Sequence, residues 1–191
     1  MEFTIENDLK NAATIKNVLA YFSRITTFVF DVDGVLTDGK LLVTEGGDFL
    51  RTFHSRDGYA LKRAVEEGFN VCIITGGKGG SIEKRLTQLG IKQFYTGAGD
   101  KLELFRNYIR THNIDPADVL FMGDDLNDFN VMQKVGLPCC PADACTEILG
   151  ISHYISTAKG GEGCVRDVIE KVMRLRKKGY GNWLDNISVS G

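Results

Sequence analysis

Short, continuous runs of apolar residues alternate along the chain with longer segments whose apolar residues recur every three or four positions. Uninterrupted apolar runs of this length are typical of strands buried on both faces of a parallel sheet. The predicted strands are 27–32, 70–74, 93–95 and 118–122, with further short candidates at 135–139 and 152–155. The first of them, rich in aromatic and branched residues, is the most strongly marked.

The segments between these runs are predicted to be helices. The first, 9–22, places Ile15, Val18, Leu19 and Phe22 on one face. The others are 58–67, 81–89, 101–111, 127–134 and 165–177. Strands that alternate with helices predict an α/β fold with a doubly wound, Rossmann-like parallel sheet. We therefore expect an N-terminal helix within 1–26, one catalytic domain over 27–177 and a C-terminal tail over 178–191.

One pair of short segments departs from this alternation. Residues 40–43 and 48–53 flank a glycine turn at 45–47, which predicts a β-hairpin. The stretch between positions 38 and 57 leaves room for these two strands and not for a separate cap domain. Apolar side chains on such a hairpin would favour association with a partner. These are Leu41, Leu42 and Val43.

Two carboxylates stand at the end of the first predicted strand. Asp31 and Asp33 follow the apolar run, and ligands of open α/β sheets bind beyond the carboxyl ends of the strands. Side chains two positions apart point the same way, about 6 to 7 Å from each other. A divalent cation would relieve the repulsion of two such charges, and one acid could attack while the other transfers a proton. Taken alone, such a pair is more typical of an ordinary strand end followed by an Asp-Gly turn.

The ends of the later strands add polar residues of complementary chemistry. Thr75 ends the second core strand, Lys101 opens a helix, and an acidic cluster follows the run at 118–122. That cluster contains Asp124, Asp125 and Asp128. Because a parallel sheet gathers the ends of its strands at one edge, we expect a hydroxyl, a lysine and several carboxylates to meet there.

In this order and spacing, the motifs resemble those of the haloacid dehalogenase superfamily. The matching segments are DVDGVLTD at 31–38, the threonine of ITGG at 74–77, Lys101, and GDDLND at 123–128. Two further segments look like the small, capless sugar-acid phosphatase branch of that superfamily: 53–58 and the glycine-rich 160–163 with Arg166 and Asp167. The resemblance extends from about 28 to 174.

The resemblance implies a role for each acidic residue. Asp31 would be the nucleophile and a ligand of Mg²⁺. Asp33 would protonate the leaving group, and its backbone carbonyl would contact the metal. Asp124 would be the third protein ligand. Asp125 and Asp128 would lie just outside the metal ligands, where they would orient groups of the site such as Lys101. For Asp125 and Asp128, a plain role as acids at a helix N-terminus is the alternative.

The same resemblance implies how the substrate is held. Thr75 and nearby backbone N–H groups would bind the phosphate, and Lys101 would neutralise its charge. Residues expected to contact the rest of the substrate are Thr37, Arg56, Gly76 and Lys78, with Arg166 as a further candidate for its carboxylate. Loop 75–81 does not have the spacing of a nucleotide-binding phosphate loop.

The expected activity is magnesium-dependent hydrolysis of a sugar-acid phosphate through an aspartyl-phosphate. The first expectation for the substrate is 3-deoxy-D-manno-octulosonate 8-phosphate, in lipopolysaccharide assembly, and the alternative is a nine-carbon ulosonate 9-phosphate. A receiver-like signalling module is the rival from another class, but receivers place the phosphorylated aspartate and the acidic pair on different strands. The capless branch completes its sites with neighbouring subunits, so we expect a homotetramer, with a monomer as the alternative.

Composition narrows the remaining possibilities. A net charge of −2 gives no indication of nucleic-acid or membrane binding, and no apolar stretch approaches the roughly 20 residues of a membrane span. The five cysteines contain no Cys-x-x-Cys pair, and we interpret them as reduced thiols of a cytoplasmic protein. A structural zinc site built from Cys139, Cys140 and Cys145 is a minor alternative.

Overall fold

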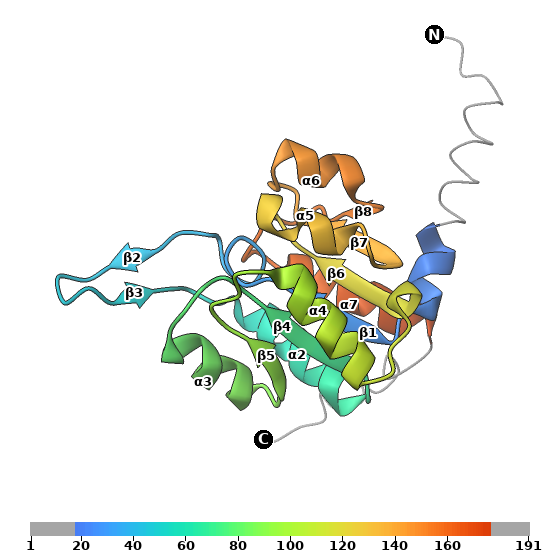
Figure 1. The fold of residues 1–191 in the computed structure, drawn as a ribbon, viewed down its shortest axis with the longest axis horizontal. Helices are drawn as coiled ribbons and strands as arrows, with labels where there is room; N and C mark the ends of the chain where they lie inside the picture. The colour runs from blue at the N-terminus through green and yellow to red at the C-terminus, as the bar shows by residue number, and fades with distance from the viewer. Residues whose placement is uncertain (1–17, 177–191) are drawn as a thin grey trace, which may run out of the picture.

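A single parallel sheet forms the centre of the computed structural model, which describes residues 18–176 (Figure 1). The strand order is β5-β4-β1-β6-β7-β8, and every neighbouring pair runs parallel. The strands are β1 (Thr27–Phe30), β4 (Asn70–Ile74), β5 (Gln93–Tyr95), β6 (Val119–Met122), β7 (Leu137–Cys140) and β8 (Tyr154–Ile155). The chain builds outward from β1 through β4 to β5 and then crosses to β6. The crevice at such a reversal is where α/β sheets bind ligands.

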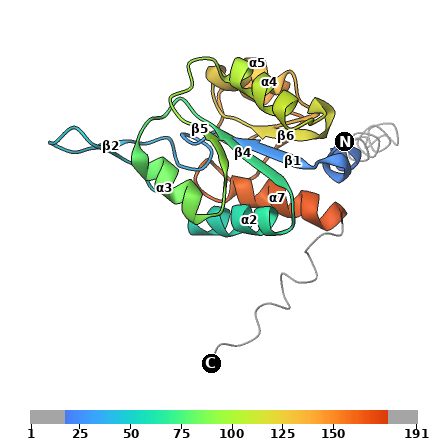
Figure 2. The same cartoon turned by 60° about the horizontal axis from the view of Figure 1, so that its bottom comes forward.

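Helices cover both faces of the sheet (Figure 2). One face carries α2 (Ser55–Glu66) and α7 (Cys164–Leu175), and the other carries α4 (Lys101–Thr111) and α5 (Leu126–Met132). The remaining helical elements are α3 (Gly80–Gln88), η1 (Pro116–Asp118) and α6 (Thr146–Ile151). Residues 18–24 are helical as well; the earlier part of the predicted helix 9–22 lies outside the described residues. The doubly wound parallel α/β fold expected from the sequence is confirmed.

The alternation of side chains along β1 divides the core into two layers. Phe28 and Phe30 point into the layer under α2 and α7, while Val29 points into the layer under α4 and α5. All three are fully buried. Burial of a large apolar side chain contributes about 1.5–3 kcal/mol, so the strand that ends at Asp31 is firmly anchored on both faces. Phe22 and Ile25, which precede β1, belong to the first of these layers.

A two-stranded antiparallel hairpin, β2 (Leu42–Val43) with β3 (Phe49–Leu50), projects from the body of the molecule (Figure 1). No cap domain accompanies it within residues 18–176. Its apolar residues are exposed rather than packed on the core: Leu41, Leu42, Val43, Phe49 and Leu50. The hairpin strands are shorter than the predicted segments 40–43 and 48–53, because only two residues of each are paired.

The other differences from the sequence-based prediction concern element ends and one short helix. Helix α2 begins at Ser55 and not at 58, since the N–H of Gly58 already donates to the carbonyl of His54. Helix α6 was not predicted; it buries Ile148 alone, so its sequence carries little periodicity. The domain limits at 26 and 177 stay predictions. Among the described helices, none has the length and apolar character needed to cross a membrane.

Candidate active site

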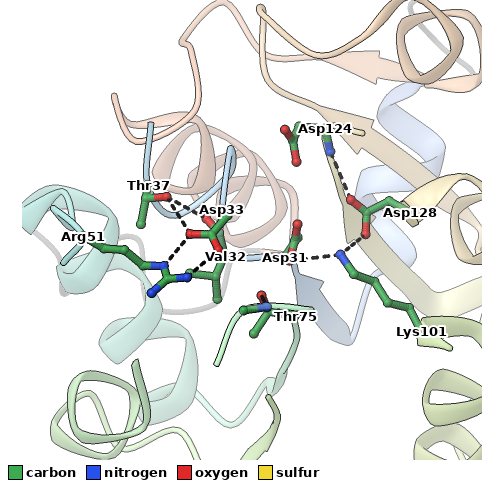
Figure 3. Close-up of polar contacts among 10 residues, drawn as sticks. Asp31, Val32, Asp33, Thr37, Arg51, Thr75, Lys101, Asp124 and Asp128 are labelled. Atoms are coloured by element: carbon green, nitrogen blue, oxygen red, sulfur yellow. Dashed lines mark hydrogen bonds and ion pairs between the residues drawn. The ribbon is translucent and has the colours of Figure 1, made fainter. Parts of the chain in front are cut away.

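The loops that follow β1, β4 and β6 bring the predicted catalytic residues together (Figure 3). Asp31 directly follows β1, Thr75 follows β4, and Asp124 follows β6 after one glycine. Parallel pairing aligns these ends, because Phe30 is in register with both Ile73 and Met122. Residues far apart in the sequence therefore share one edge of the sheet, as the motif order predicted.

Lys101 is the cation at the centre of the cluster. Its Nζ lies 3.0 Å from Asp31 Oδ1 and 2.8 Å from Asp128 Oδ1, and its side chain is only 6% exposed. Burial lowers the pKa of Lys101, but the charges of Asp31 and Asp128 outweigh that effect and hold the pKa above its usual value. Lys101 is thus a permanent positive charge at this site.

Three buried or half-buried carboxylates face one another beside this lysine. Asp31, Asp124 and Asp128 each offer an oxygen within 4.8 Å of the other two. Burial, followed by the charge of Asp31, raises the pKa of Asp124 to about 7, and the same two causes raise the pKa of Asp128 to about 7. Burial also raises the pKa of Asp31, against the opposing charge of Lys101. A single lysine does not balance three carboxylates, so the cluster favours a further cation.

The donor set fits Mg²⁺, a hard cation that prefers carboxylate and carbonyl oxygens. Asp124 Oδ1 is buried and has no hydrogen-bond partner among residues 18–176. The backbone N–H of Asp124 donates to Asp128 Oδ2 at 3.3 Å. The backbone leaves room for this carboxylate, since a Cβ at Gly34 would lie 2.0 Å from Asp124 Oδ2. Gly34 also has a φ of +91°, which favours glycine.

Asp33 lies next to this cluster and is held by a residue that the sequence did not single out. Arg51, just after β3, donates from Nε to Asp33 Oδ1 at 2.6 Å and from Nη2 to Asp33 Oδ2 at 2.9 Å. The hydroxyl of Thr37 donates to Asp33 Oδ1 at 3.4 Å. No motif marks Arg51, because its contact with Asp33 depends on where the chain returns from β3 to the body of the molecule.

The predicted phosphate-binding residue Thr75 is buried below Asp31 (Figure 3). A hydrogen bond from Thr75 is one of the contacts that oppose the rise in the pKa of Asp31. The Thr75 hydroxyl also accepts the N–H of Gly77 at 3.0 Å, which fixes the start of the following loop. Thr75 and its loop therefore follow β4 at the same edge of the sheet as Asp31.

The other predicted residues lie around this centre in different settings. Arg56 and Gly76 are exposed, and Lys78 extends from the loop after β4 across Gly97. The Thr37 hydroxyl makes its contacts within its own loop, to Val32 O and Asp33. Arg166 pairs with Glu170 at 2.6 Å on α7. The substrate-binding roles of these residues stay predictions.

The acidic residues of the GDDLND segment separate into two kinds. Asp125 is exposed and accepts the N–H of Leu126 at the start of α5, which is the helix-capping alternative. Asp128 is fully buried and paired with Lys101, so it belongs to the charged centre itself. Within residues 18–176, the three aspartates are the one group of potential metal ligands that converges. The cysteines at 139, 140 and 145 form no such group.

Comparisons with known proteins agree with this arrangement. Residues 96–169 match a family model described as haloacid dehalogenase-like hydrolase. The chain is 36% identical over 162 residues to the 3-deoxy-D-manno-octulosonate 8-phosphate phosphatase KdsC of Yersinia pestis, covering 85% of this chain and 87% of that protein. It is 37% identical over 162 residues to KdsC of Escherichia coli K12, covering 85% and 86% of the two chains.

Solved structures give the same result. The Yersinia pestis phosphatase superposes with a TM-score of 0.82 at 35% identity, over 84% of this chain and 87% of that one. The phosphatase from Moraxella catarrhalis, solved with magnesium, phosphate and KDO, superposes with a TM-score of 0.87 at 26% identity, over 91% and 99% of the chains. The parallel sheet, the aspartates at the ends of its strands and the buried Lys101 together identify a haloacid dehalogenase-like hydrolase. Within that class, the chain belongs to the family of the KdsC phosphatases.

The raised pKa values predict how the metal-free protein responds to pH. Asp124 and Asp128 have pKa values of about 7 in the fold, above the ordinary 3.8, so the folded state binds more protons than the unfolded state between these values. Their contribution to stability is complete below the lower value and is lost as the pH rises through about 7. We expect the metal-free melting temperature of Asp124→Asn, relative to wild type, to increase between about pH 5 and pH 8. If the difference in melting temperature between the variant and wild type did not change with pH, the raised pKa of Asp124 would be contradicted.

Proposed function

We propose that this protein is a magnesium-dependent phosphatase that hydrolyses 3-deoxy-D-manno-octulosonate 8-phosphate. The single observation that carries the proposal is the position of Asp31 at the end of β1. Its carboxylate lies 3.0 Å from the Lys101 ammonium and has an oxygen within 4.8 Å of carboxylate oxygens of Asp124 and Asp128. The relatives that match over most of the chain are phosphatases of this sugar-acid phosphate.

The residues of the site can divide the reaction into two displacements. An oxygen of Asp31 forms a bond to phosphorus while the bond from phosphorus to the sugar oxygen breaks, and Asp33 gives its proton to that oxygen. Asp33 then takes a proton from water, whose oxygen attacks phosphorus and releases phosphate and free Asp31. When bound, Mg²⁺ neutralises charge on the phosphoryl oxygens and aligns them with Asp31.

Lys101 and Thr75 complete the phosphate site in this scheme. The phosphoryl oxygens carry most of the charge in the transition state, and catalysis consists largely of positioning and charge stabilisation. Lys101 keeps its charge because of Asp31 and Asp128, while Thr75 and the backbone N–H groups of its loop supply donors. Asp128 holds Lys101 in place at 2.8 Å.

The assembly and location of the protein are part of the same proposal. The exposed apolar hairpin supports association into a homotetramer whose neighbouring subunits cover the open sites, since a contiguous exposed apolar surface is a common interaction site. All five cysteines are free thiols, and four of them are buried. Free thiols support a cytoplasmic location.

A kinetic comparison of two sugar-acid phosphates tests the substrate assignment. We expect kcat/KM for 3-deoxy-D-manno-octulosonate 8-phosphate to exceed that for a nine-carbon ulosonate 9-phosphate by at least about 10-fold, the usual scale for one mismatched substrate group. The measurement is phosphate release with Mg²⁺ under identical conditions. Preference for the nine-carbon substrate would reassign the sugar, and phosphate release from neither would overturn the proposed function.

A further inference from the structure

An arginine at the end of the hairpin donates hydrogen bonds to both carboxylate oxygens of Asp33, the proposed acid/base residue. Arg51 donates to Asp33 Oδ1 at 2.6 Å and to Asp33 Oδ2 at 2.9 Å, the two-pronged geometry that gives arginine–carboxylate pairs their directionality. The Arg51 side chain is 5% exposed, against 29% for Asp33. Arg51 Nη1 has no hydrogen-bond partner within residues 18–176, so Asp33 is the group that fixes the guanidinium.

The loop after β4 is shaped around this pair. A Cβ at Gly77 would lie 2.8 Å from Asp33 Oδ2 and 3.1 Å from Arg51 Nη2. The first distance is shorter than real Cβ contacts, so a side chain at position 77 would displace the Asp33 carboxylate. The absence of a side chain at Gly77 therefore leaves the space that the Asp33–Arg51 pair occupies.

We propose that Arg51 is a positioning residue, which holds the Asp33 carboxyl group at the angle needed for proton transfer to the leaving-group oxygen. This inference rests on the acid/base role of Asp33 in the proposed function. Each carboxyl oxygen has two lone pairs. Arg51 occupies one on each oxygen and Thr37 donates to Oδ1, which leaves the second lone pair of Oδ2 for the proton in transit. A proton donor must come within about 2.6–3.2 Å of its acceptor, and a free aspartate side chain would sample many other orientations.

This role makes the hairpin part of the active site. Arg51 directly follows β3, and within the described residues β2 and β3 pair only with each other. The position of the hairpin therefore sets the position of the guanidinium.

The leaving group provides a test that a purely structural role would not affect. A nitrophenolate leaves without a proton, whereas a sugar or alkyl alkoxide needs one. For Arg51→Met we expect kcat/KM to fall about 10² -fold for glycerol phosphate and the sugar phosphate, the low end of general acid catalysis, and less than about 3-fold for p-nitrophenyl phosphate. Since kcat/KM covers only steps up to the first irreversible one, it isolates this proton transfer. Arg51→Lys should restore part of the loss.

The matched control is Arg24→Met, which removes another arginine–aspartate pair, Arg24 with Asp118 at 2.8 Å on the surface. For Arg24→Met, kcat/KM should match that of wild type for both the alkyl and the nitrophenyl phosphate esters. Gly77→Ala should reproduce the Arg51→Met pattern, while Gly80→Ala, which has open space for its methyl group, should not. Equal losses for both ester classes, or no loss, would overturn the positioning role. The comparison of simple esters holds even if the natural sugar is a different one, so the two proposals can fail separately.

Discussion

Replacing Asp31 by asparagine is expected to lower kcat/KM by at least about 10⁴-fold, the usual consequence of removing a catalytic nucleophile. Asparagine keeps the shape of the side chain and can still accept a hydrogen bond from Lys101, but its amide does not displace an alkoxide from phosphorus. Residual hydrolysis at one hundredth of the wild-type rate or more would rule out the covalent route.

The same substitution should leave the metal-free fold intact. Burial raises the pKa of Asp31, and neutralising one of three clustered carboxylates reduces their mutual repulsion. Lys101 keeps its contact with Asp128. We therefore expect a metal-free melting temperature no lower than that of wild type and a smaller increase on adding Mg²⁺. The control is Asp115→Asn, an exposed helix-capping position where asparagine caps as well; it should retain full activity.

Replacing Lys101 by methionine should have the largest effect on stability. The substitution leaves three buried or half-buried carboxylates without their lysine, and removing one partner of a buried ion pair costs about 3–5 kcal/mol. For a chain of this size that corresponds to a fall in melting temperature of about 6–20 °C. Added Mg²⁺ should recover part of the loss, because it supplies positive charge to the same carboxylates. Thermal melts with and without Mg²⁺ measure both effects.

Activity should fall together with stability in this variant, by about 10²–10³-fold, as when a single charge-stabilising donor is removed. Lys62→Met is a suitable control, since Lys62 lies exposed on α2 and pairs with Glu66 at 3.9 Å. Its melting temperature and kcat/KM should match those of wild type. A stable, active Lys101→Met protein would show that Lys101 is not the charge that holds the site together.

Much of this site could be predicted from the sequence because its residues stand at the ends of buried parallel strands. The apolar runs that end at Asp31, Thr75 and Asp124 mark both the strands and the edge where ligands bind. Parallel pairing then brings together residues that are distant in the chain. Lys101 follows the same logic, since the first residue of α4 directly faces this edge.

The remainder depends on contacts that have no local signal. Arg51 reaches Asp33 only because of how the hairpin leaves the body, and it lies outside the segment 53–58 whose family resemblance drew attention to Arg56. The buried position of Asp128 was likewise undecided, since an acid in the first turn of a helix is common on the surface. Helix α6 is too short to produce a clear periodic pattern. These features follow from tertiary packing and not from residue spacing.

A crystal structure with Mg²⁺ and trifluoroberyllate, a mimic of the phosphoryl group, is the most direct measurement of the central claim. We expect beryllium bonded to an Asp31 oxygen, Lys101 beside its fluorides, and Mg²⁺ held by Asp31, Asp124 and the Asp33 carbonyl. Beryllium on another residue, or Mg²⁺ bound away from Asp124, would contradict it.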